Sequence, residues 1–367
     1  MMNPTNRLKI AIIYGPLLHY RVALFEILSR RYELTVFTTK FNRGTIEHGF
    51  TVIEIPALHL GPFHAQIGLR RRLLRGRFDV CISFLDVRHI DSLAAVFFPI
   101  TPRTFCWGVW LTRSGIANYI RLSAIKRCEA ALFYCYEHLQ EVAELESDLD
   151  KLYVAPNTFA VPDVYMASSP KVRDSILFVG SFAPRKGLER LVRLFASALS
   201  EMPGHIRLVL LGDGSLREQL IKLTNDLGVS GRVEMPGRVN DTNVLAYYYS
   251  RALVSVSLSQ AGLSVLQSMG FGVPFLTIRG SISGGEINNI SNGITGFLID
   301  DDDTEIIKNL RTIVKDPVRM LAMGAAAKAH YRRYASIQNY AQGFFDMLEG
   351  TRLTNVWKGE ANEHEIY

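Results

Sequence analysis

Short apolar runs recur along the whole chain, and segments with helical periodicity separate them. In the first half these runs lie at residues 9–14, 33–38, 51–55, 79–83, 104–107, 130–134 and 152–155. Helices are expected between them, for example over residues 20–29 and 117–128. The runs are apolar throughout instead of alternating with polar residues, which is typical of parallel strands with both faces buried. The pattern predicts an α/β fold built on a doubly wound parallel sheet.

A proline-rich stretch interrupts this alternation once. Pro156, Pro162 and Pro170, together with Ser168 and Ser169, are typical of a connection between domains. Beyond it, further strands are expected at residues 175–179, 205–211, 232–235, 252–258, 274–278 and 296–299. The predicted organisation is a Rossmann-like domain over 1–160, a linker over 161–174, a second Rossmann-like domain over 175–334, a helix over 335–350 that returns to the first domain, and a polar tail over 351–367.

The composition is that of a globular protein, because 48% of the 367 residues are hydrophobic and only 21% are charged. The longest apolar run, Leu93 to Ile100, is too short to span a bilayer. The stretch from Arg7 to Tyr14 has the character of a secretory signal but lacks a small-residue cleavage site, so we interpret it as the first strand. Four cysteines without a Cys-x-x-Cys pair predict reduced core residues of a cytosolic protein.

Charge is distributed unevenly along the chain. Residues 1–127 carry 18 Lys and Arg against 7 Asp and Glu, a net charge of +11, while the remaining residues have a net charge of −5. A basic first third is compatible with nucleic acid, an anionic membrane surface or an anionic substrate. No nucleic-acid-binding module or basic motif interleaved with aromatic residues is present, so we do not expect a nucleic-acid partner.

One basic stretch is also amphipathic when it is drawn as a helix. Phe63, Ile67, Leu74 and Phe78 fall within about 60° of one another on a helical wheel. The surrounding arginines are Arg70, Arg71, Arg72, Arg75 and Arg77. Such a stripe is typical of an interfacial helix on anionic lipid, but a domain helix packed on the sheet has the same pattern. The sequence leaves both interpretations open.

A glycine turn followed by two cations is the first candidate binding motif. The expected strand at 175–179 leads into Gly180, then Arg185 and Lys186, and a helix opens after Gly187. This arrangement would direct backbone N–H groups, a helix N-terminus and Lys186 at one point, which suits a diphosphate. A strand, a loop and a helix with two solvated cations would explain the same residues.

A second candidate motif surrounds Gly262. That glycine precedes a helix, and Ser259 and Gln267 are eight positions apart across its start, where both could form hydrogen bonds to hydroxyl groups of a sugar or ribose. The alternative is a buried helix held close to the sheet by small residues such as Gly270 and Gly272.

Together with other segments, these two motifs form an ordered series over about 120 residues. The additional segments are 208–214, 232–239, 252–259, 284–285 and 292–298. In order and spacing the series resembles the donor domain of the GT-B glycosyltransferases, specifically the retaining family four. The first half resembles these enzymes only in architecture.

The resemblance implies an α/β protein of the GT-B fold, with two doubly wound Rossmann-like domains facing a central cleft. The first domain would bind the acceptor and the second a nucleoside-diphosphate sugar, with UDP favoured over GDP. It further implies transfer with retention, no metal and no cofactor. The expected acceptor is a glycan or lipid-linked glycan of cell-surface polysaccharide or lipopolysaccharide biosynthesis. The expected location is the cytoplasm, with peripheral association with the inner face of an anionic membrane as a further option.

The resemblance also assigns roles to residues. Lys186 would neutralise the leaving diphosphate, Arg185 would supply a cation where Ser181 replaces a common arginine, and Ser259 and Gln267 would complete the catalytic set. The donor-binding residues would be Gly15, Gly180, Ser181, Arg185, Lys186, Gly212, Arg238, Val239, Gly262, Leu263, Ser264 and Gln267. By position in the first domain, the acceptor candidates are His19, Arg21, Asp86, Arg88 and Trp107.

This chain departs from the family pattern at several polar positions. Ser259 and Gln267 stand where members usually have two glutamates, Asn288 replaces another glutamate, and Val109 replaces a histidine. The pattern fits a divergent enzyme or a catalytically silent GT-B subunit that binds a protein or a glycan. A nucleotide-sugar epimerase on the same fold would need acid and base groups that the donor region largely lacks.

A run of four aspartates, residues 300–303, is the strongest acidic cluster in the sequence. Asp302 and Glu305 have the spacing of a helix capping box, which we prefer to a metal site.

Overall fold

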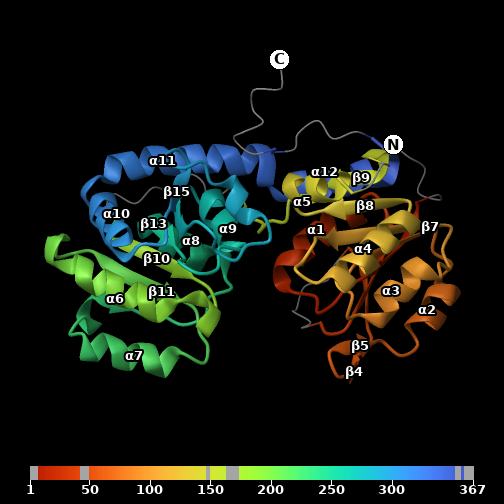
Figure 1. The fold of residues 1–367 in the computed structure, drawn as a ribbon, viewed down its shortest axis with the longest axis horizontal. Coiled ribbons are helices and arrows are strands. Elements are labelled where there is room, and N and C mark those ends of the chain that lie inside the picture. The colour runs from red at the N-terminus through yellow and green to blue at the C-terminus, as the bar shows by residue number, and fades with distance from the viewer. Residues whose placement is uncertain (1–6, 42–48, 146–148, 163–172, 352–356, 359–367) are drawn as a thin grey trace, which may run out of the picture. The chain divides into compact units, whose positions relative to one another are not determined.

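The computed structural model describes residues 7–41, 49–145, 149–162, 173–351 and 357–358, and it divides into two compact units (Figure 1). Unit 1 comprises Met1–Asn157 and Ile337–Trp357, and unit 2 comprises Thr158–Ser336 and Lys358–Tyr367. Most of the predicted linker and almost all of the predicted polar tail lie outside the described residues. The two ends of the predicted linker are packed into unit 2. The Val161 backbone N–H donates a hydrogen bond to the Tyr331 hydroxyl oxygen at 3.1 Å, and Arg251 forms an ion pair with Asp174 at 3.0 Å.

Unit 1 is built on a seven-stranded sheet in which every strand is parallel to its neighbours. The strand order is β3-β2-β1-β6-β7-β8-β9. The bounds are β1 Lys9–Ile13, β2 Glu33–Thr38, β3 Thr51–Glu54, β6 Val80–Phe84, β7 Arg103–Val109, β8 Ala130–Phe133 and β9 Leu152–Val154. Each strand expected in the first half is therefore present, with ends shifted by no more than a few residues.

Helices cover both faces of this sheet, which explains why its strands are apolar throughout. One face packs against α2 (Leu69–Gly76), α3 (Ile90–Phe97), α4 (Gly115–Arg127) and α5 (Tyr136–Ala143). The helices α1 (His19–Ser29) and α12 (Ile337–Glu349) pack against each other, and α12 also contacts β8 and β9. The fit of α12 is close, because a β-carbon on Gly343 would lie 2.4 Å from the Val154 carbonyl oxygen.

A small antiparallel hairpin, β4 (Leu58–Leu60) and β5 (Phe63–Ala65), stands apart from the large sheet. It overturns the continuous helical stripe expected between Phe63 and Phe78, because Phe63 belongs to a strand and α2 begins only at Leu69.

Within α2 the buried residues are Leu69 and Leu73, whereas two members of the predicted stripe, Ile67 and Leu74, are 73% and 56% exposed. Gly68, with φ of +87°, breaks the expected helix at its N-terminal end. The five arginines of the stretch, Arg70, Arg71, Arg72, Arg75 and Arg77, are all exposed.

Unit 2 contains a six-stranded parallel sheet with the order β12-β11-β10-β13-β14-β15. The bounds are β10 Ser175–Val179, β11 Arg207–Leu211, β12 Val233–Glu234, β13 Ala252–Val256, β14 Phe275–Ile278 and β15 Gly296–Ile299. Successive residues of β10 enter different cores, since Ile176 and Phe178 belong to one cluster and Leu177 to the other. The sheet is therefore buried on both faces, and the α/β doubly wound class predicted from the sequence is confirmed.

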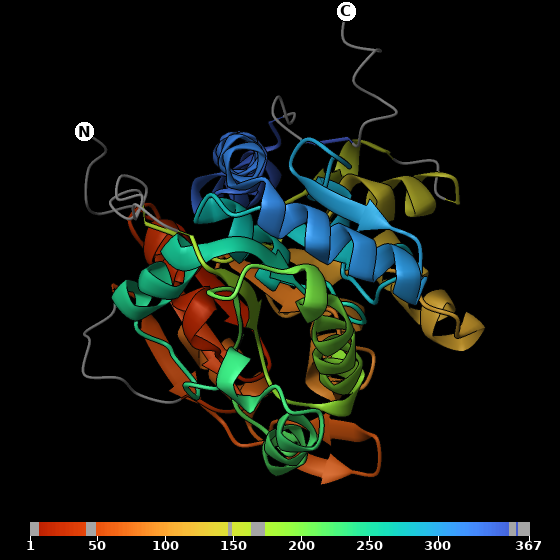
Figure 2. The ribbon, with the colours of Figure 1, turned by 90° about the vertical axis from the view of Figure 1, so that its left-hand side faces the viewer.

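Two groups of helices form these cores (Figure 2). The first group is α6 (Leu188–Ala198), α7 (Arg217–Asp226) and α10 (Asp303–Lys315), and the second includes α8 (Thr242–Arg251) and α9 (Ser264–Gly270). The helix α11 (Pro317–His330) contributes residues to both cores. Within the described ranges, no helix combines the length and apolar character needed to cross a membrane.

The four consecutive aspartates have a structural explanation. The Asp302 carboxylate accepts a hydrogen bond from the Glu305 backbone N–H at 2.8 Å and caps α10. Asp301 and Asp303 form ion pairs with Arg190 at 2.6 and 2.7 Å. In the part of the chain that the structure describes, no cluster of three or more His, Cys, Asp or Glu has the geometry to hold a metal ion.

Candidate functional site

The loops that follow β10, β13 and β14 meet at one edge of the sheet in unit 2. The Ile282 N–H donates to the Ser259 carbonyl at 2.9 Å, and the Ala261 N–H donates back to the Ile282 carbonyl at 3.0 Å. Arg185 Nε donates to Gln260 Oε1 at 3.0 Å. Because β10 lies between β11 and β13, this edge contains the topological switch point of the sheet, where doubly wound folds bind ligands.

Two adjacent cations lie in the first of these loops. Arg185 and Lys186 end a 3₁₀ turn, Pro184–Lys186, and Gly187 then adopts φ of +63° and opens α6. Burial lowers the pKa of Lys186, the neighbouring Arg185 guanidinium lowers it further, and Glu286 raises it. A bound anion would raise the pKa of Lys186 again, because an opposite charge stabilises the ammonium form. Two adjacent cations at the opening of α6 are thus compatible with an anionic ligand.

Glu286 is a carboxylate near Lys186 that sequence reasoning missed. It is buried, and its Oε2 accepts hydrogen bonds from the Gly284 N–H at 2.7 Å and from Ser283 Oγ at 3.1 Å. Although positions 259, 267 and 288 lack a glutamate, Glu286 thus keeps an acidic side chain near Lys186. The signal that could have identified it is the glutamate directly after the double glycine 284–285, since Gly285 has φ of +103° and starts a short 3₁₀ turn.

Ser259 and Gln267, the two expected replacements of glutamates, have different surroundings. Ser259 lies against the cation loop, because a β-carbon on Gly187 would come within 2.3 Å of Ser259 Oγ. Gln267 is buried, and its Oε1 accepts a hydrogen bond from the Tyr249 hydroxyl at 3.2 Å. A glutamate at 259 would have to displace this close contact with the backbone of the cation loop.

One predicted donor-binding glycine, Gly212, is explained by packing alone. A β-carbon on Gly212 would lie 1.8 Å from the Gly180 carbonyl oxygen, so the loops after β10 and β11 require a glycine there whatever they bind. Ser181 and Arg238 are exposed, whereas Val239 packs against the core.

The backbone around Gly262 is accessible. Leu263 and Ser264 at the start of α9 are partly exposed, and a β-carbon on Gly262 or on Gly15 of unit 1 would have no atom within 4 Å. Neither glycine has a positive φ, so neither backbone conformation requires glycine.

Because Gly262 has open space at its β-carbon position and no positive φ, an alanine there can test whether a ligand approaches this backbone. The free energy of unfolding of the Gly262→Ala variant should lie within about 0.5 kcal/mol of the wild-type value, as is usual for surface substitutions. If a ligand contacts this backbone, the added methyl group should weaken nucleotide-sugar binding about tenfold, measured by titration calorimetry. The matched control is Gly231→Ala, another glycine with open space around its β-carbon position. Equal affinities of the two variants would show that no ligand approaches Gly262.

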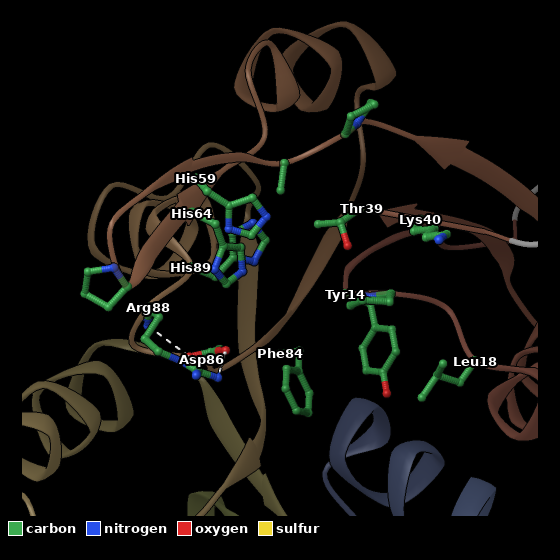
Figure 3. Close-up of a pocket in the computed structure, with 15 residues that line it drawn as sticks. Tyr14, Leu18, Thr39, Lys40, His59, His64, Phe84, Asp86, Arg88 and His89 are labelled. Carbon is green, nitrogen blue, oxygen red and sulfur yellow. Dashed lines mark hydrogen bonds and ion pairs between the residues drawn. The ribbon is translucent and has the colours of Figure 1, made fainter. Parts of the chain in front are cut away.

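Unit 1 has a pocket of about 790 Å³ at its own switch point, between β1 and β6 (Figure 3). The loops after β1, β2, β3 and β6 and the β4–β5 hairpin surround it. The lining residues are Tyr14, Gly15, Pro16, Leu18, Thr39, Lys40, Pro56, Ala57, His59, Pro62, His64, Phe84, Asp86, Arg88 and His89.

Three histidines form a stack in the wall of this pocket. The rings of His64 and His89 are 4.7 Å apart and nearly parallel, and His59 and His64 are 5.8 Å apart. Burial lowers the pKa of His89 to about 4, and the adjacent His64 lowers it too, while Asp86 opposes the change. His89 Nδ1 shares a hydrogen bond of 2.7 Å with Ser92 Oγ. His59 and His64 were not predicted, because the hairpin that carries them was not recognised.

Of the predicted acceptor residues, Asp86 and Arg88 line the pocket. Arg88 Nε and Nη2 donate to the Asp86 carboxylate at 3.0 and 2.9 Å. Burial opposes ionisation of Asp86, but the hydrogen bonds from Arg88 lower its pKa overall. His19, at the start of α1, is exposed and does not line the pocket.

Arg21 and Trp107 correct the prediction, because both are core residues. Trp107 is completely buried, and Arg21 is only 3% exposed. The Arg21 guanidinium donates to the hydroxyls of Tyr14, Tyr134 and Tyr340 and lies 5.4 Å from the centre of the Trp107 ring. It connects α1 to the ends of β1 and β8 and to α12, so its contacts are those of a structural residue.

Comparison with known proteins identifies the class of this fold. Residues 167–330, within unit 2, match the family described as Glycosyl transferases group 1. HepE of Anabaena, solved in complex with UDP, superposes with a TM-score of 0.71 at 15% identity, covering 93% of this chain and 100% of HepE. WaaG, a glycosyltransferase involved in lipopolysaccharide biosynthesis, superposes with a TM-score of 0.65 at 15% identity, covering 93% of this chain and 100% of WaaG.

Sequence relatives match over shorter segments. The lipopolysaccharide core biosynthesis glycosyltransferase LpsE of Rhizobium meliloti is 34% identical over 142 residues, which are 38% of this chain and 39% of LpsE. An N-acetyl-D-galactosaminyltransferase of Campylobacter jejuni, whose name specifies a glycan on PP-undecaprenol, is 24% identical over 312 residues, 80% of this chain and 84% of that protein. LpsE and two GDP-mannose-dependent mannosyltransferases are matched over only 39%, 45% and 42% of their own length.

The chain therefore has the GT-B fold, with two Rossmann-like domains. Its residues 167–330 match the family described as Glycosyl transferases group 1.

Proposed function

We propose that this protein is a glycosyltransferase of retaining family four that moves a sugar from a nucleoside-diphosphate donor to a glycan or lipid-linked acceptor. Unit 2 binds the donor and unit 1 binds the acceptor. The observation that carries the proposal is the pair of cations, Arg185 and Lys186, at the switch point of a group 1 glycosyl transferase domain. The proposed pathway is cell-surface polysaccharide or lipopolysaccharide synthesis, which the names of LpsE and WaaG support.

In the proposed reaction, the cation loop acts on the leaving group. Charge develops on the diphosphate as the bond between it and the sugar breaks, and Lys186 and Arg185 stabilise that charge. Retention follows if the leaving phosphate accepts the proton of the acceptor hydroxyl, so the protein need not supply a base. On this proposal the reaction needs neither a metal nor a cofactor, and the cations of the loop take the place of a divalent ion. Glu286 is positioned to keep Lys186 protonated.

The donor is expected to be a UDP-sugar. The complexes of HepE with UDP and with UDP-glucose support UDP, whereas the names of two sequence relatives specify GDP-mannose.

Thermal shift measurements with UDP-, GDP- and dTDP-sugars, with and without EDTA, test the proposal. Ligand at a hundredfold excess over its dissociation constant stabilises the folded protein by about 2.7 kcal/mol. We expect a shift with one nucleotide sugar that EDTA does not change. If none of the sugars shifts the transition, the proposed activity is wrong and a catalytically silent GT-B subunit is the better explanation.

We further propose that unit 1 associates with the inner face of an anionic membrane. The β4–β5 hairpin exposes Leu58, Leu60 and Phe63. Ile67, just before α2, and Leu74, within α2, are also exposed and lie close in sequence to the arginines. Exposed apolar side chains together with clustered arginines favour anionic bilayers.

Cosedimentation with vesicles tests this association. Wild-type protein should bind vesicles of mixed phosphatidylglycerol and phosphatidylcholine. It should bind vesicles of phosphatidylcholine alone much more weakly. Replacing Arg71, Arg72 and Arg75 by glutamine should lower the partition coefficient on the order of a hundredfold, at about 1 kcal/mol for each arginine. The matched control replaces three exposed cations of unit 2, Arg193, Lys222 and Lys308. Equal losses in both variants would contradict a specific surface on unit 1.

A further inference from the structure

The β4–β5 hairpin presents two chemically different faces. His59 and His64 are directly opposite each other in the register of the hairpin, and both line the pocket. Because side chains of a strand alternate between faces, the exposed Leu58, Leu60 and Phe63 fall on the other side. The hairpin therefore places a pair of imidazoles in the wall of the pocket, next to the buried ring of His89.

The charges around the pocket favour an anion. The carboxylate of Asp86 is already paired with Arg88 in a bidentate contact, so these two groups largely neutralise each other. Lys40 lies across the pocket from the histidines (Figure 3), and it is exposed. Among the described residues, no ion pair joins Lys40 to a carboxylate. The pocket thus offers an ammonium group on one side and imidazoles on the other.

His89 provides an independent observation. It is 2% exposed and lines the pocket, and its Nε2 has no hydrogen-bond partner within the described part of the chain. The nearest carboxylate oxygen, on Asp91, is 4.0 Å away, too far for a hydrogen bond. A buried polar atom without a partner costs about 1–3 kcal/mol, so the site gains if a polar ligand group or a water reaches it.

We propose that this pocket binds a phosphate group of the acceptor, held between Lys40 and the imidazoles of His59 and His64. A phosphate monoester carries a charge near −2 and has several acceptor oxygens, which matches a lysine and two imidazoles better than a single carboxylate would. The aromatic rings of Tyr14 and Phe84 line the same pocket and would contact the apolar part of the ligand. This inference rests on the proposed function, since it specifies the acceptor of the same reaction.

Titration calorimetry of the full chain tests the inference. The probes are a soluble sugar 1-phosphate, geranyl phosphate and a neutral methyl glycoside, each titrated in the presence of saturating UDP. Both phosphates should bind and the methyl glycoside should not. Tighter binding of geranyl phosphate indicates a lipid-linked source of the phosphate, and tighter binding of the sugar phosphate indicates a soluble one. If neither phosphate binds, or if the neutral glycoside binds equally well, the inference is wrong.

Substitutions of the pocket residues test whether the phosphate binds in this pocket. Lys40→Gln and His59→Gln replace exposed side chains, so the fold should persist, and each should weaken phosphate binding about tenfold or more. Arg30→Gln, an exposed cation at the end of α1, is the control and should bind as the wild type does. Wild-type affinity in both pocket variants would overturn the inference.

Donor binding is measured on the same samples and separates the two hypotheses. The Lys186→Ala variant should keep its affinity for the phosphate probes, because that lysine belongs to unit 2. Loss of phosphate binding in this variant would place the probe in the donor site and overturn the inference. Phosphate binding without any nucleotide-sugar binding would instead contradict the proposed donor while leaving the pocket assignment intact.

Discussion

Replacing Lys186 by alanine should abolish the thermal shift produced by the preferred nucleotide sugar. The ammonium group lies in a partly buried loop beside Arg185, and burial already lowers its pKa. Hydrogen bonds to charged groups contribute about 1.5–3 kcal/mol, so its loss should weaken donor binding roughly 10- to 100-fold. If Lys186 also stabilises the departing diphosphate, kcat should fall a further 10²- to 10³-fold.

A matched control separates this effect from a general loss of charge. Lys222, on α7 of the same unit, is exposed and outside the loops at the switch point, so Lys222→Ala should bind the donor as the wild type does. Lys186→Arg tests geometry, because arginine keeps the charge but spreads it over a planar group. A Lys186→Ala protein with wild-type affinity and kcat would exclude the cation loop as the diphosphate site.

Replacing Arg21 by leucine should destabilise unit 1 by about 3 kcal/mol or more. The guanidinium is 3% exposed and serves three tyrosine hydroxyls from different elements, Tyr14, Tyr134 and Tyr340. Without Arg21 these buried hydroxyls lose their donor, and each unsatisfied polar group costs about 1–3 kcal/mol. The Tyr340→Phe variant keeps the ring and removes one hydroxyl, so it should cost only about 1 kcal/mol.

Tryptophan fluorescence can measure this effect in unit 1 alone. The three tryptophans of the chain, Trp107, Trp110 and Trp357, all belong to unit 1. Urea unfolding followed by their fluorescence therefore reports that unit without a signal from unit 2. A midpoint for Arg21→Leu that equals the wild-type midpoint would show that the tyrosine cluster is stable without the guanidinium.

The strands were predictable because their signal is local. A parallel strand covered on both faces must be apolar along its whole length, and that requirement is visible in any short window of sequence. The cation loop was also predictable, since glycine, arginine and lysine between a strand and a helix form a compact pattern. The hairpin was missed because its two strands have only three residues each, which periodicity over a longer window merges with the basic stretch that follows.

The sequence by itself determined the two doubly wound sheets and the residues of the cation loop, because both depend on neighbours in the chain. Only the tertiary structure decided which polar side chains are buried. Arg21 meets Tyr340 more than 300 positions away, and His89, at the start of α3, stacks on His64 of the hairpin. Glu286 comes near Lys186 from a different strand end. The energy of a charged or polar group depends on the groups that surround it in space, and sequence spacing does not report those surroundings.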